Sequence, residues 1–126
     1  MIKFRVWDKE ENKMHKVKTI EFSRRGARII HLAEVNSNGK GDHKRWHSSV
    51  ELMQSTGLKD KNGTEIYEGD IIKNPYDEIY TVKWFDAAFY LEEKYNGGFD
   101  YFELYSGDNK KVIGNIYENP ELLEGE

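Results

Sequence analysis

The chain has 126 residues, no cysteine and a formal net charge of −4 at pH 7, with 37% hydrophobic, 13% aromatic and 33% charged residues. This length suits one domain with its own core, or two tightly fused halves. Without cysteine, disulfides, thiolate nucleophiles and cysteine-bound zinc are excluded. No apolar run approaches the roughly 18 residues of a membrane span, and the start MIKFRVWDKE lacks the apolar segment of a signal peptide. We therefore expect a cytoplasmic protein without membrane contact.

Charge is divided unevenly along the chain. Residues 1–50 hold 12 Lys and Arg against 6 Asp and Glu, giving +6, whereas residues 51–126 hold 7 against 17, giving −10. A basic half can mark a nucleic-acid face. Opposite charges also allow the two halves to neutralise each other, within a chain or between subunits. Because the acidic half would weaken non-specific attraction to phosphate, we favour neutralisation.

The first half indicates two β-hairpins. Residues 2–7 alternate apolar and polar side chains as a half-buried strand does, and residues 14–17 return as extended chain after a polar turn. A turn signal at residues 23–26 then precedes a further predicted strand. Residues 36–49, NSNGKGDHKRWHSS, combine small turn residues with a basic cluster and predict a mobile loop or connector.

The second half indicates about five short strands at roughly ten-residue spacing, which is typical of a small barrel of SH3-like or OB type, with a sandwich as the alternative. One strand ends at Gly57, and the Asn62-Gly63 pair predicts a tight turn in which both residues accept positive φ. Residues 80–85 and 101–105 predict strands, with a loop over residues 92–100. Asn119 and Pro120 predict the start of a short helical turn.

These patterns together predict an all-β protein. An N-terminal β-hairpin sheet with the basic connector, residues 1–49, is fused to a C-terminal small SH3-like β-barrel, residues 50–126, which ends in the short helical turn. The two parts could also form one compact unit.

Three segments resemble the YopX family of phage and prophage proteins: FRVWD (residues 4–8), TGLKDKNGTEIYEGDII (residues 56–72) and VIGNIYENPELLEG (residues 112–125). The resemblance implies a mostly β protein encoded by temperate phages or prophages, with no established activity and no agreed catalytic residues. It carries over structural roles alone, to the Asn62-Gly63 turn, the Gly69-Asp70 turn and the Asn119-Pro120 cap. Residues 18–50 and 74–110 carry no motif that matches the family.

Two basic clusters are candidates for nucleic-acid contact. One lies on the predicted turn of the second hairpin and the other lies in the predicted connector beside a tryptophan, so together they could offer phosphate contacts and base stacking. Exposed loops also carry such charges for solubility alone. The candidate residues are Arg24, Arg25, Arg28, Lys44, Arg45 and Trp46.

Residues with metal-binding or acid–base chemistry do not converge on a site. His43 and His47 stand four apart beside Asp42, a spacing that suits two metal ligands on a helix, but two preceding glycines and the lack of apolar periodicity favour a solvated loop. The paired carboxylates lie in or beside predicted loops without a neighbouring histidine or serine nucleophile. They are Glu92-Glu93, Asp77-Glu78, and Asp100 with Glu103. We therefore expect no metal, no cofactor and no enzymatic activity.

We expect a non-enzymatic phage accessory protein that acts through protein contacts in the host bacterial cytoplasm. Its partners would be further copies of itself, in a homo-oligomer, and an unidentified phage or host protein. Small β domains leave strand edges that can pair with a second copy, and outward aromatics such as Trp7 and Phe85 could supply a contact core. The oppositely charged halves would suit a head-to-tail contact. Nucleic-acid binding through the first half is the alternative.

Overall fold

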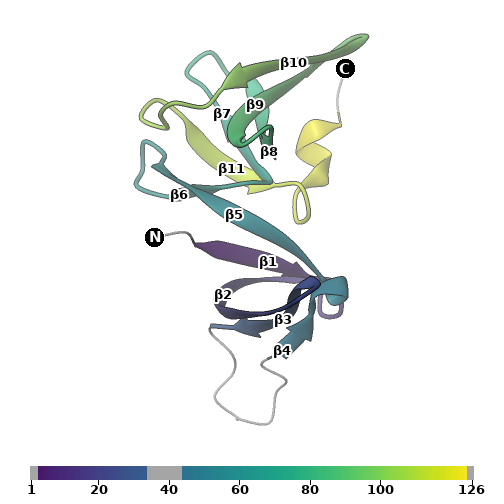
Figure 1. The fold of residues 1–126 in the computed structure, drawn as a ribbon. Helices are drawn as coiled ribbons and strands as arrows, with labels where there is room; N and C mark the ends of the chain where they lie inside the picture. The colour runs from purple at the N-terminus through teal and green to yellow at the C-terminus, as the bar shows by residue number, and fades with distance from the viewer. Residues whose placement is uncertain (1–2, 34–43, 125–126) are drawn as a thin grey trace. The chain divides into compact units, whose positions relative to one another are not determined.

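Two antiparallel sheets make up the computed structural model, which describes residues 3–33 and 44–124 (Figure 1). In these residues, two short 3-10 helices are the only helical elements, so the all-β class is confirmed. The chain divides into two compact units, Met1–Gln54 (unit 1) and Ser55–Glu126 (unit 2). This boundary lies inside a strand, five residues after the division that we predict from the sequence.

Unit 1 is built from the predicted hairpins. Its elements in chain order are β1 (Phe4–Asp8), β2 (Lys13–Ser23), β3 (Gly26–Leu32), β4 (Lys44–Trp46), η1 (His47–Ser49) and the first part of β5 (Val50–Lys59). Each strand from β1 to β4 pairs with the next, and β5 returns to pair with the free side of β1. Residues 44–49 thus form a strand and a 3-10 turn where we predicted a loop. The rest of the predicted connector, residues 36–43, lies outside the described residues.

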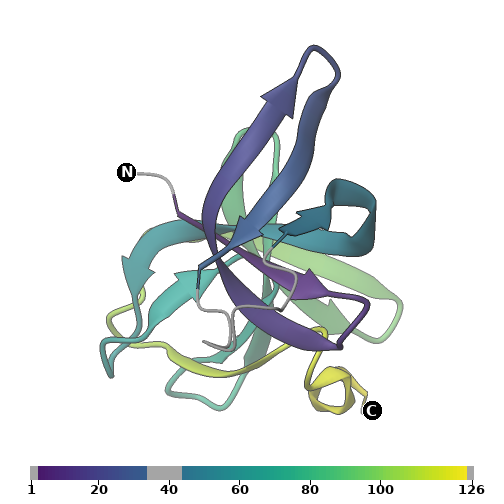
Figure 2. The same ribbon diagram turned by 90° about the horizontal axis from the view of Figure 1, so that it is seen from below.

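The β2–β3 hairpin extends beyond the strands on either side of it. β1 pairs with residues 13–16 of β2, and β4 pairs with residues 29–31 of β3, so the residues nearer the turn form a two-stranded ribbon (Figure 2). At the turn, Ser23 Oγ accepts the Arg25 N–H at 3.1 Å, and Gly26 has a φ of +108°. The turn predicted at residues 23–26 is confirmed.

The core of unit 1 is a cluster of aliphatic side chains from four strands. Cross-strand register places Val17 opposite Leu32 and Ile20 opposite Ile30, so that these side chains share a face. Burying a side chain of this size stabilises the fold by about 1.5–3 kcal/mol. The buried members are Val6, Ile30, Leu32 and Val50, with Val17 and Ile20 packed against them.

Unit 2 contains an open five-stranded sheet. The second part of β5 pairs with β6, and the remaining strands pair in the order β10-β9-β8-β7-β11. Pairing among residues 55–124 closes no barrel, so the predicted SH3-like barrel is not confirmed. The elements are β6 (Glu65–Tyr67), β7 (Asp70–Lys73), β8 (Ile79–Phe85), β9 (Ala88–Tyr95), β10 (Gly98–Glu103), β11 (Lys111–Asn115) and η2 (Pro120–Leu123).

The loop predicted over residues 92–100 is wrong. β9 continues to Tyr95 and β10 begins at Gly98, because Glu92 pairs across the sheet with Thr81 on one side and Tyr101 on the other.

The hydrophobic core of unit 2 is a single cluster of side chains, as in unit 1. Its buried members are Ile66, Ile72, Tyr80, Val82 and Leu91, with Leu58, Phe89, Leu104 and Val112 packed against them.

A buried carboxylate organises the turn between β5 and β6. Asp60 Oδ1 accepts the N–H groups of Asn62 and Thr64 at 2.9 and 2.8 Å, and Oδ2 accepts the N–H of Val112 in β11 at 2.9 Å. Gly63 has a φ of +85°, whereas Asn62 does not have a positive φ. The turn is therefore confirmed at Gly63, and the positive φ predicted for Asn62 is wrong.

The Gly69-Asp70 turn is present as predicted, whereas the Asn119-Pro120 helix start is present without the predicted cap. Gly69 has a φ of +88°, and Asp70 Oδ2 accepts the Tyr67 N–H at 2.8 Å, as an Asp in a tight turn can do. Pro120 begins η2 as predicted. Asn119 precedes it, but its Oδ1 accepts the N–H of Asn115 at 3.1 Å and makes no cap bond to the helix.

The hydrogen bonds to Asp60 make its protonation part of the stability of unit 2. Burial raises the pKa of this carboxyl. Four other effects lower the pKa by more than burial raises it: the N–H groups of Val112, Thr64 and Asn62, and the charge of Lys111. The net shift of the pKa is therefore downward. A lowered folded-state pKa gives stability that is fully present above the unfolded pKa of about 3.9. That stability is lost as the pH falls through the folded-state pKa.

We expect Asp60→Asn to lower the free energy of unfolding by about 1–3 kcal/mol at neutral pH, because hydrogen bonds to an ionised acceptor are replaced. The difference from the wild type should narrow as the pH falls below about 4. Urea denaturation at a series of pH values measures both effects. The control is Asp108→Asn, which changes an exposed carboxylate in a nearby loop. A difference that stays constant into the acid range would contradict the role of Asp60.

Candidate functional site

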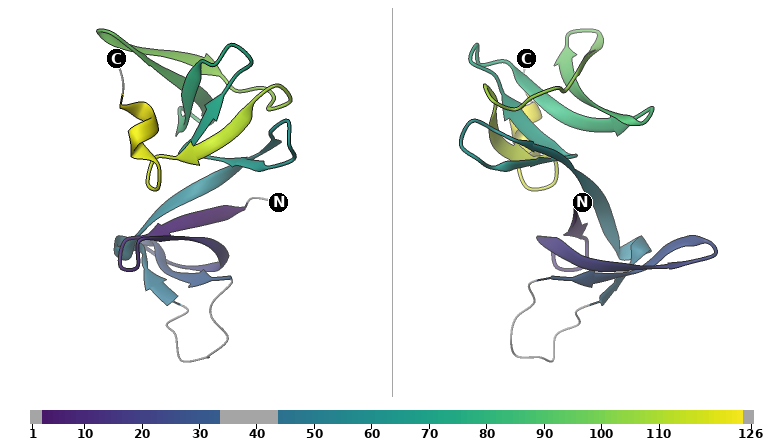
Figure 3. Two further views of the ribbon diagram at one scale, coloured as in Figure 1. Left: turned by 180° about the vertical axis from the view of Figure 1, so that it is seen from behind. Right: turned by 60° about the vertical axis from the view of Figure 1, so that its left-hand side comes forward.

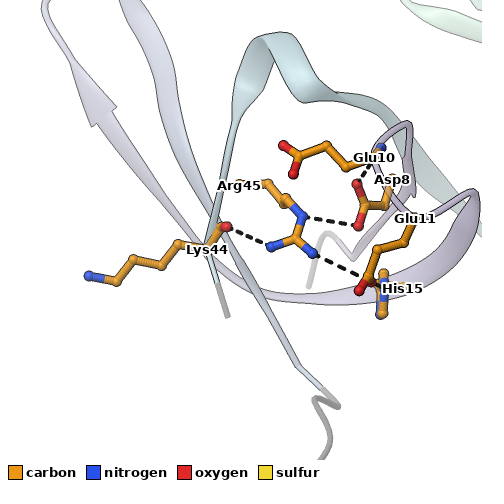
Figure 4. Close-up of polar contacts among 6 residues, drawn as sticks. All are labelled: Asp8, Glu10, Glu11, His15, Lys44 and Arg45. Carbon is orange, nitrogen blue, oxygen red and sulfur yellow. Dashed lines mark hydrogen bonds and ion pairs between the residues drawn. The ribbon is translucent and has the colours of Figure 1, made fainter. Parts of the chain in front are cut away.

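A buried ion pair joins β1 and β4 in unit 1 (Figure 4). Asp8 ends β1 and is fully buried, and Arg45 in the middle of β4 is 7% exposed. Arg45 Nε donates to Asp8 Oδ2 at 3.0 Å, its Nη1 donates to the Lys44 carbonyl at 2.9 Å, and its Nη2 lies 3.4 Å from Glu11 Oε1. The second Asp8 oxygen accepts the Glu10 N–H at 3.0 Å. The guanidinium is therefore held on all three of its nitrogens.

His15 extends this cluster, since its Nε2 lies 3.5 Å from Glu11 Oε1. One potential ligand atom from each of Asp8, Glu11 and His15 lies within 4.8 Å of the others, a set of donors that a metal ion could use. Arg45, however, already pairs with both carboxylates. A metal would have to displace a buried guanidinium, so we interpret the cluster as structural.

The earlier metal candidates lie elsewhere. His47 is exposed in η1, and Asp42 and His43 lie outside the described residues. The ion-pair cluster itself escaped the sequence analysis because Asp8 and Arg45 are 37 residues apart. Only the pairing of β1 with β2 and of β3 with β4 brings the two side chains to one face.

The structure corrects one of the residues predicted to contact nucleic acid. Arg45 is buried and ion-paired, so its guanidinium is not available to a phosphate. Its neighbours Lys44 and Trp46 are both exposed, as alternation along β4 requires. They share the outer face with Ile29 and His31 of β3, their cross-strand partners.

The arginines of the second hairpin occupy a different part of unit 1. Arg24 and Arg25 are exposed at the β2–β3 turn, at the end of the ribbon. Neither forms an ion pair within residues 3–33 and 44–124. For Arg28 the structure describes the backbone in β3 and not the side chain. The two basic clusters that could together contact nucleic acid thus lie in different places, one at the ribbon end and one on β4.

Exposed aromatic rings gather on one face of β8, β9 and β10 in unit 2. The register places Val82 opposite Leu91 on the core side, and it puts Phe85, Tyr90 and Tyr101 on the other side. Phe85 stacks on Tyr90 with ring centroids 4.3 Å apart and meets Tyr101 edge-on at 5.3 Å. Phe85 is 38% exposed and Tyr101 is 47% exposed. We call this surface the aromatic face.

Glu92 contacts Tyr101 of β10 and Lys83 of β8 on the aromatic face. Its Oε2 accepts the Tyr101 hydroxyl at 2.7 Å, and its Oε1 lies 3.9 Å from Lys83 Nζ. The hydrogen bond to Glu92 raises the pKa of the Tyr101 hydroxyl above its usual value. This hydrogen bond and the edge contact with Phe85 hold the Tyr101 ring in place at the surface.

A groove of about 920 Å³ lies on the same side of the sheet, between the β9–β10 turn and the C-terminal helical turn. Figure 3 shows η2, in yellow, beside the strands of unit 2. The apolar lining comes from Ile79, Phe99, Leu122 and Leu123, and the charged lining comes from Asp77, Glu92, Glu93 and Lys94. The groove thus combines an apolar floor with a net negative charge.

Comparison with known proteins finds a matching protein family and solved structures with a similar fold. The sequence model of the YopX protein family matches residues 3–124. The chain belongs to the YopX family. Protein EF1440 from Enterococcus faecalis, known from a crystal structure, is 30% identical, with a match that covers 98% of this chain and 99% of that one at a TM-score of 0.62. Among curated proteins, none matches the chain.

Protein YopX from Bacillus subtilis, also known from a crystal structure, shares the fold. It is 23% identical, and the match covers 97% of this chain and 98% of that one at a TM-score of 0.60. The YopX-like segments at residues 56–72 and 112–125 contain Asp60, Gly69 and Asn119, whose bonds or conformations shape turns of unit 2. The ribbon end, the aromatic face and most of the groove lie outside these segments. The family match itself runs over residues 3–124 and so includes these surfaces as well.

The chain also carries no helix, in the parts described, with the length and apolar character needed to cross a membrane.

Removing the Arg45 charge should be strongly destabilising. Asp8 would remain as a buried charge without its partner, so we expect Arg45→Met to lower the free energy of unfolding by about 3–5 kcal/mol. The matched control, Lys44→Met, changes an exposed side chain and should stay within about 0.5 kcal/mol. Urea denaturation measures both. The double variant Asp8→Asn/Arg45→Met should recover part of the loss, and equal losses for Arg45→Met and Lys44→Met would contradict the structural role of the ion pair.

Proposed function

We propose that this member of the YopX family is a non-enzymatic phage or prophage accessory protein that acts through protein contacts in the bacterial cytoplasm, including contacts with copies of itself. The aromatic face carries the proposal. Large rings that remain exposed in a group, rather than singly, are typical of protein interaction surfaces. Because Phe85 and Tyr101 are already held by ring contacts, little side-chain entropy would be lost when a partner covers them.

The edge of the sheet supports contact with a partner protein other than a second β10 edge. β10 is an edge strand in the described structure, and five of its six residues are exposed. Its sequence, GFDYFE, has none of the lysines or prolines with which proteins commonly protect a strand edge from pairing. A partner could therefore contact both the backbone of β10 and the rings beside it.

The ion-pair cluster supports the non-enzymatic part of the proposal. Asp8, Glu11 and His15 are residue types that catalyse proton transfer or bind metals. The carboxylates of Asp8 and Glu11 both pair with Arg45, and Asp8 is fully buried, so the cluster is suited to holding two strands together.

Self-association predicts a mass in solution well above the 14.8 kDa of one chain. Light scattering coupled to size-exclusion chromatography measures it. The double variant Phe85→Ser/Tyr101→Ser should shift the protein toward the monomer at the same concentration, because it removes apolar contact area. Tyr76→Ser, which changes an exposed ring in the β7–β8 loop, is the control and should leave the mass unchanged. A monomeric wild type at micromolar concentration would rule out self-association.

Nucleic-acid binding is the second candidate, favoured by the exposed indole of Trp46 beside Lys44 and by the exposed arginines of the ribbon end. This candidate predicts affinity for DNA or RNA that falls steeply with salt, and a salt slope that Arg24→Gln/Arg25→Gln reduces by about two. Fluorescence anisotropy with labelled oligonucleotides measures both. Absence of binding at low salt would eliminate the candidate.

A further inference from the structure

We infer that the groove of one copy receives the β2–β3 turn of a second copy, so that the protein assembles head to tail. The inference rests on the proposed function, because it names two surfaces, apart from the rings of the aromatic face, through which copies would associate. Each copy offers both surfaces, and such a heterologous contact leads to a ring when the rotation closes and to a filament when it does not.

The first surface is the ribbon tip, residues 22–26. Phe22 is 72% exposed, which is unusual for a phenylalanine in a soluble protein, and the exposed Arg24 and Arg25 follow it directly. The hydrogen bond from the Arg25 N–H to Ser23 Oγ holds the turn in shape. The tip is therefore a pre-formed projection with one apolar ring and two cations that have no ion-pair partner in the described residues.

The groove of unit 2 has the complementary chemistry. Ile79, Leu122 and Leu123 could surround an aromatic ring, and Asp77 and Glu93 lie among the lining residues as partners for cations. Asp77 is available for exchange because its present ion pair, with Lys73 at 3.2 Å, is exposed and so contributes little stability. A groove of about 920 Å³ is large enough for a phenylalanine and the stems of two arginines.

Charge identifies a second copy as the occupant. The half of the sequence that carries the ribbon tip has an excess of positive charge, and the half that carries the groove has an excess of negative charge. Opposite potentials on the two surfaces would speed encounter and fix orientation. A symmetric contact between two grooves, or between two β10 edges, would instead bring carboxylates together, since β10 carries Asp100 and Glu103. The head-to-tail arrangement avoids this repulsion.

Exchanging the charges tests the contact. The tip variant is Arg24→Glu/Arg25→Glu and the groove variant is Asp77→Lys/Glu93→Lys, all at positions where the side chain is at least partly exposed. Each variant alone opposes like charges across the contact, so light scattering should show a mass near that of the monomer. The single chain that carries all four substitutions should regain the mass of the wild-type assembly. In an equimolar mixture the two variants pair only in alternation, so the mixture should assemble again, and it should reach the wild-type mass where the number of copies is even.

Recovery in the mixture also answers the concern that a variant is misfolded, because an unfolded chain would not be restored by a partner. Phe22→Ser provides an uncharged test and should lower the assembled fraction, whereas Tyr76→Ser should not. Circular dichroism confirms that each variant is folded.

The outcomes separate this inference from the proposed function. If the wild type assembles and the tip and groove variants assemble equally well, the inference is overturned, while self-association through another surface stands. If both variants are monomeric but neither the mixture nor the four-substitution chain recovers, the two surfaces do not contact each other, and the inference is again overturned. A monomeric wild type contradicts self-association itself. If that monomer binds oligonucleotides and the tip variant does not, the tip is a nucleic-acid surface.

Discussion

Three backbone N–H groups converge on the Asp60 carboxylate, and the architecture of unit 2 depends on this convergence. Two of the donors shape the turn after β5, and the third belongs to Val112, 52 residues later. One side chain thus joins two YopX-like segments of the unit, the β5–β6 turn and strand β11. The Lys61 N–H, which donates to the Lys110 carbonyl at 2.9 Å, adds a backbone bond between the same segments. An ionised acceptor makes such bonds shorter and stronger than a neutral one would.

Close packing at two places in unit 2 explains two glycines, one beside the β5–β6 turn and one in β11, whose role the sequence alone does not reveal. A Cβ on Gly107 would lie 2.4 Å from the Lys59 carbonyl oxygen, and a Cβ on Gly114 would lie 2.6 Å from Asn119 Oδ1. Both approaches are shorter than van der Waals contact. In the YopX-like segment of residues 112–125, Gly114 is thus required by the close approach of the Asn119 side chain.

Local patterns were sufficient for many, though not all, of the strands and turns of this chain. Alternation predicted β1 and β8, and glycine with asparagine or aspartate marked the turns, because both signals arise from residues that are adjacent in sequence. The loop predicted over residues 92–100 failed because cross-strand pairing outweighs a locally polar composition. Arg45 was placed in an exposed basic loop for a related reason. Its environment is decided by Asp8, and no window of the sequence contains both residues.

The candidate surfaces depend even more on residues that are far apart in the sequence, so local patterns could not predict them. The sequence predicted an outward ring at Phe85, but its meeting with Tyr90 and Tyr101 on one face requires the register of three strands. The groove requires in addition that Leu122 and Leu123 lie near Ile79. The predicted barrel could not be distinguished from an open sheet, since strand spacing alone does not tell whether the last strand pairs with the first.

The buried pair between β1 and β4 bears on how this chain tolerates insertions. β4 has three residues and, among the described strands, pairs only with β3, so its backbone hydrogen bonds define its register weakly. A shift by one residue would turn Arg45 outward and leave Asp8 buried without a cation, and that penalty holds β4 in place. The register of β4 is thus independent of how many residues precede it. The connection between β3 and β4 can be lengthened, shortened or rewritten during evolution while the sheet on either side keeps its alignment.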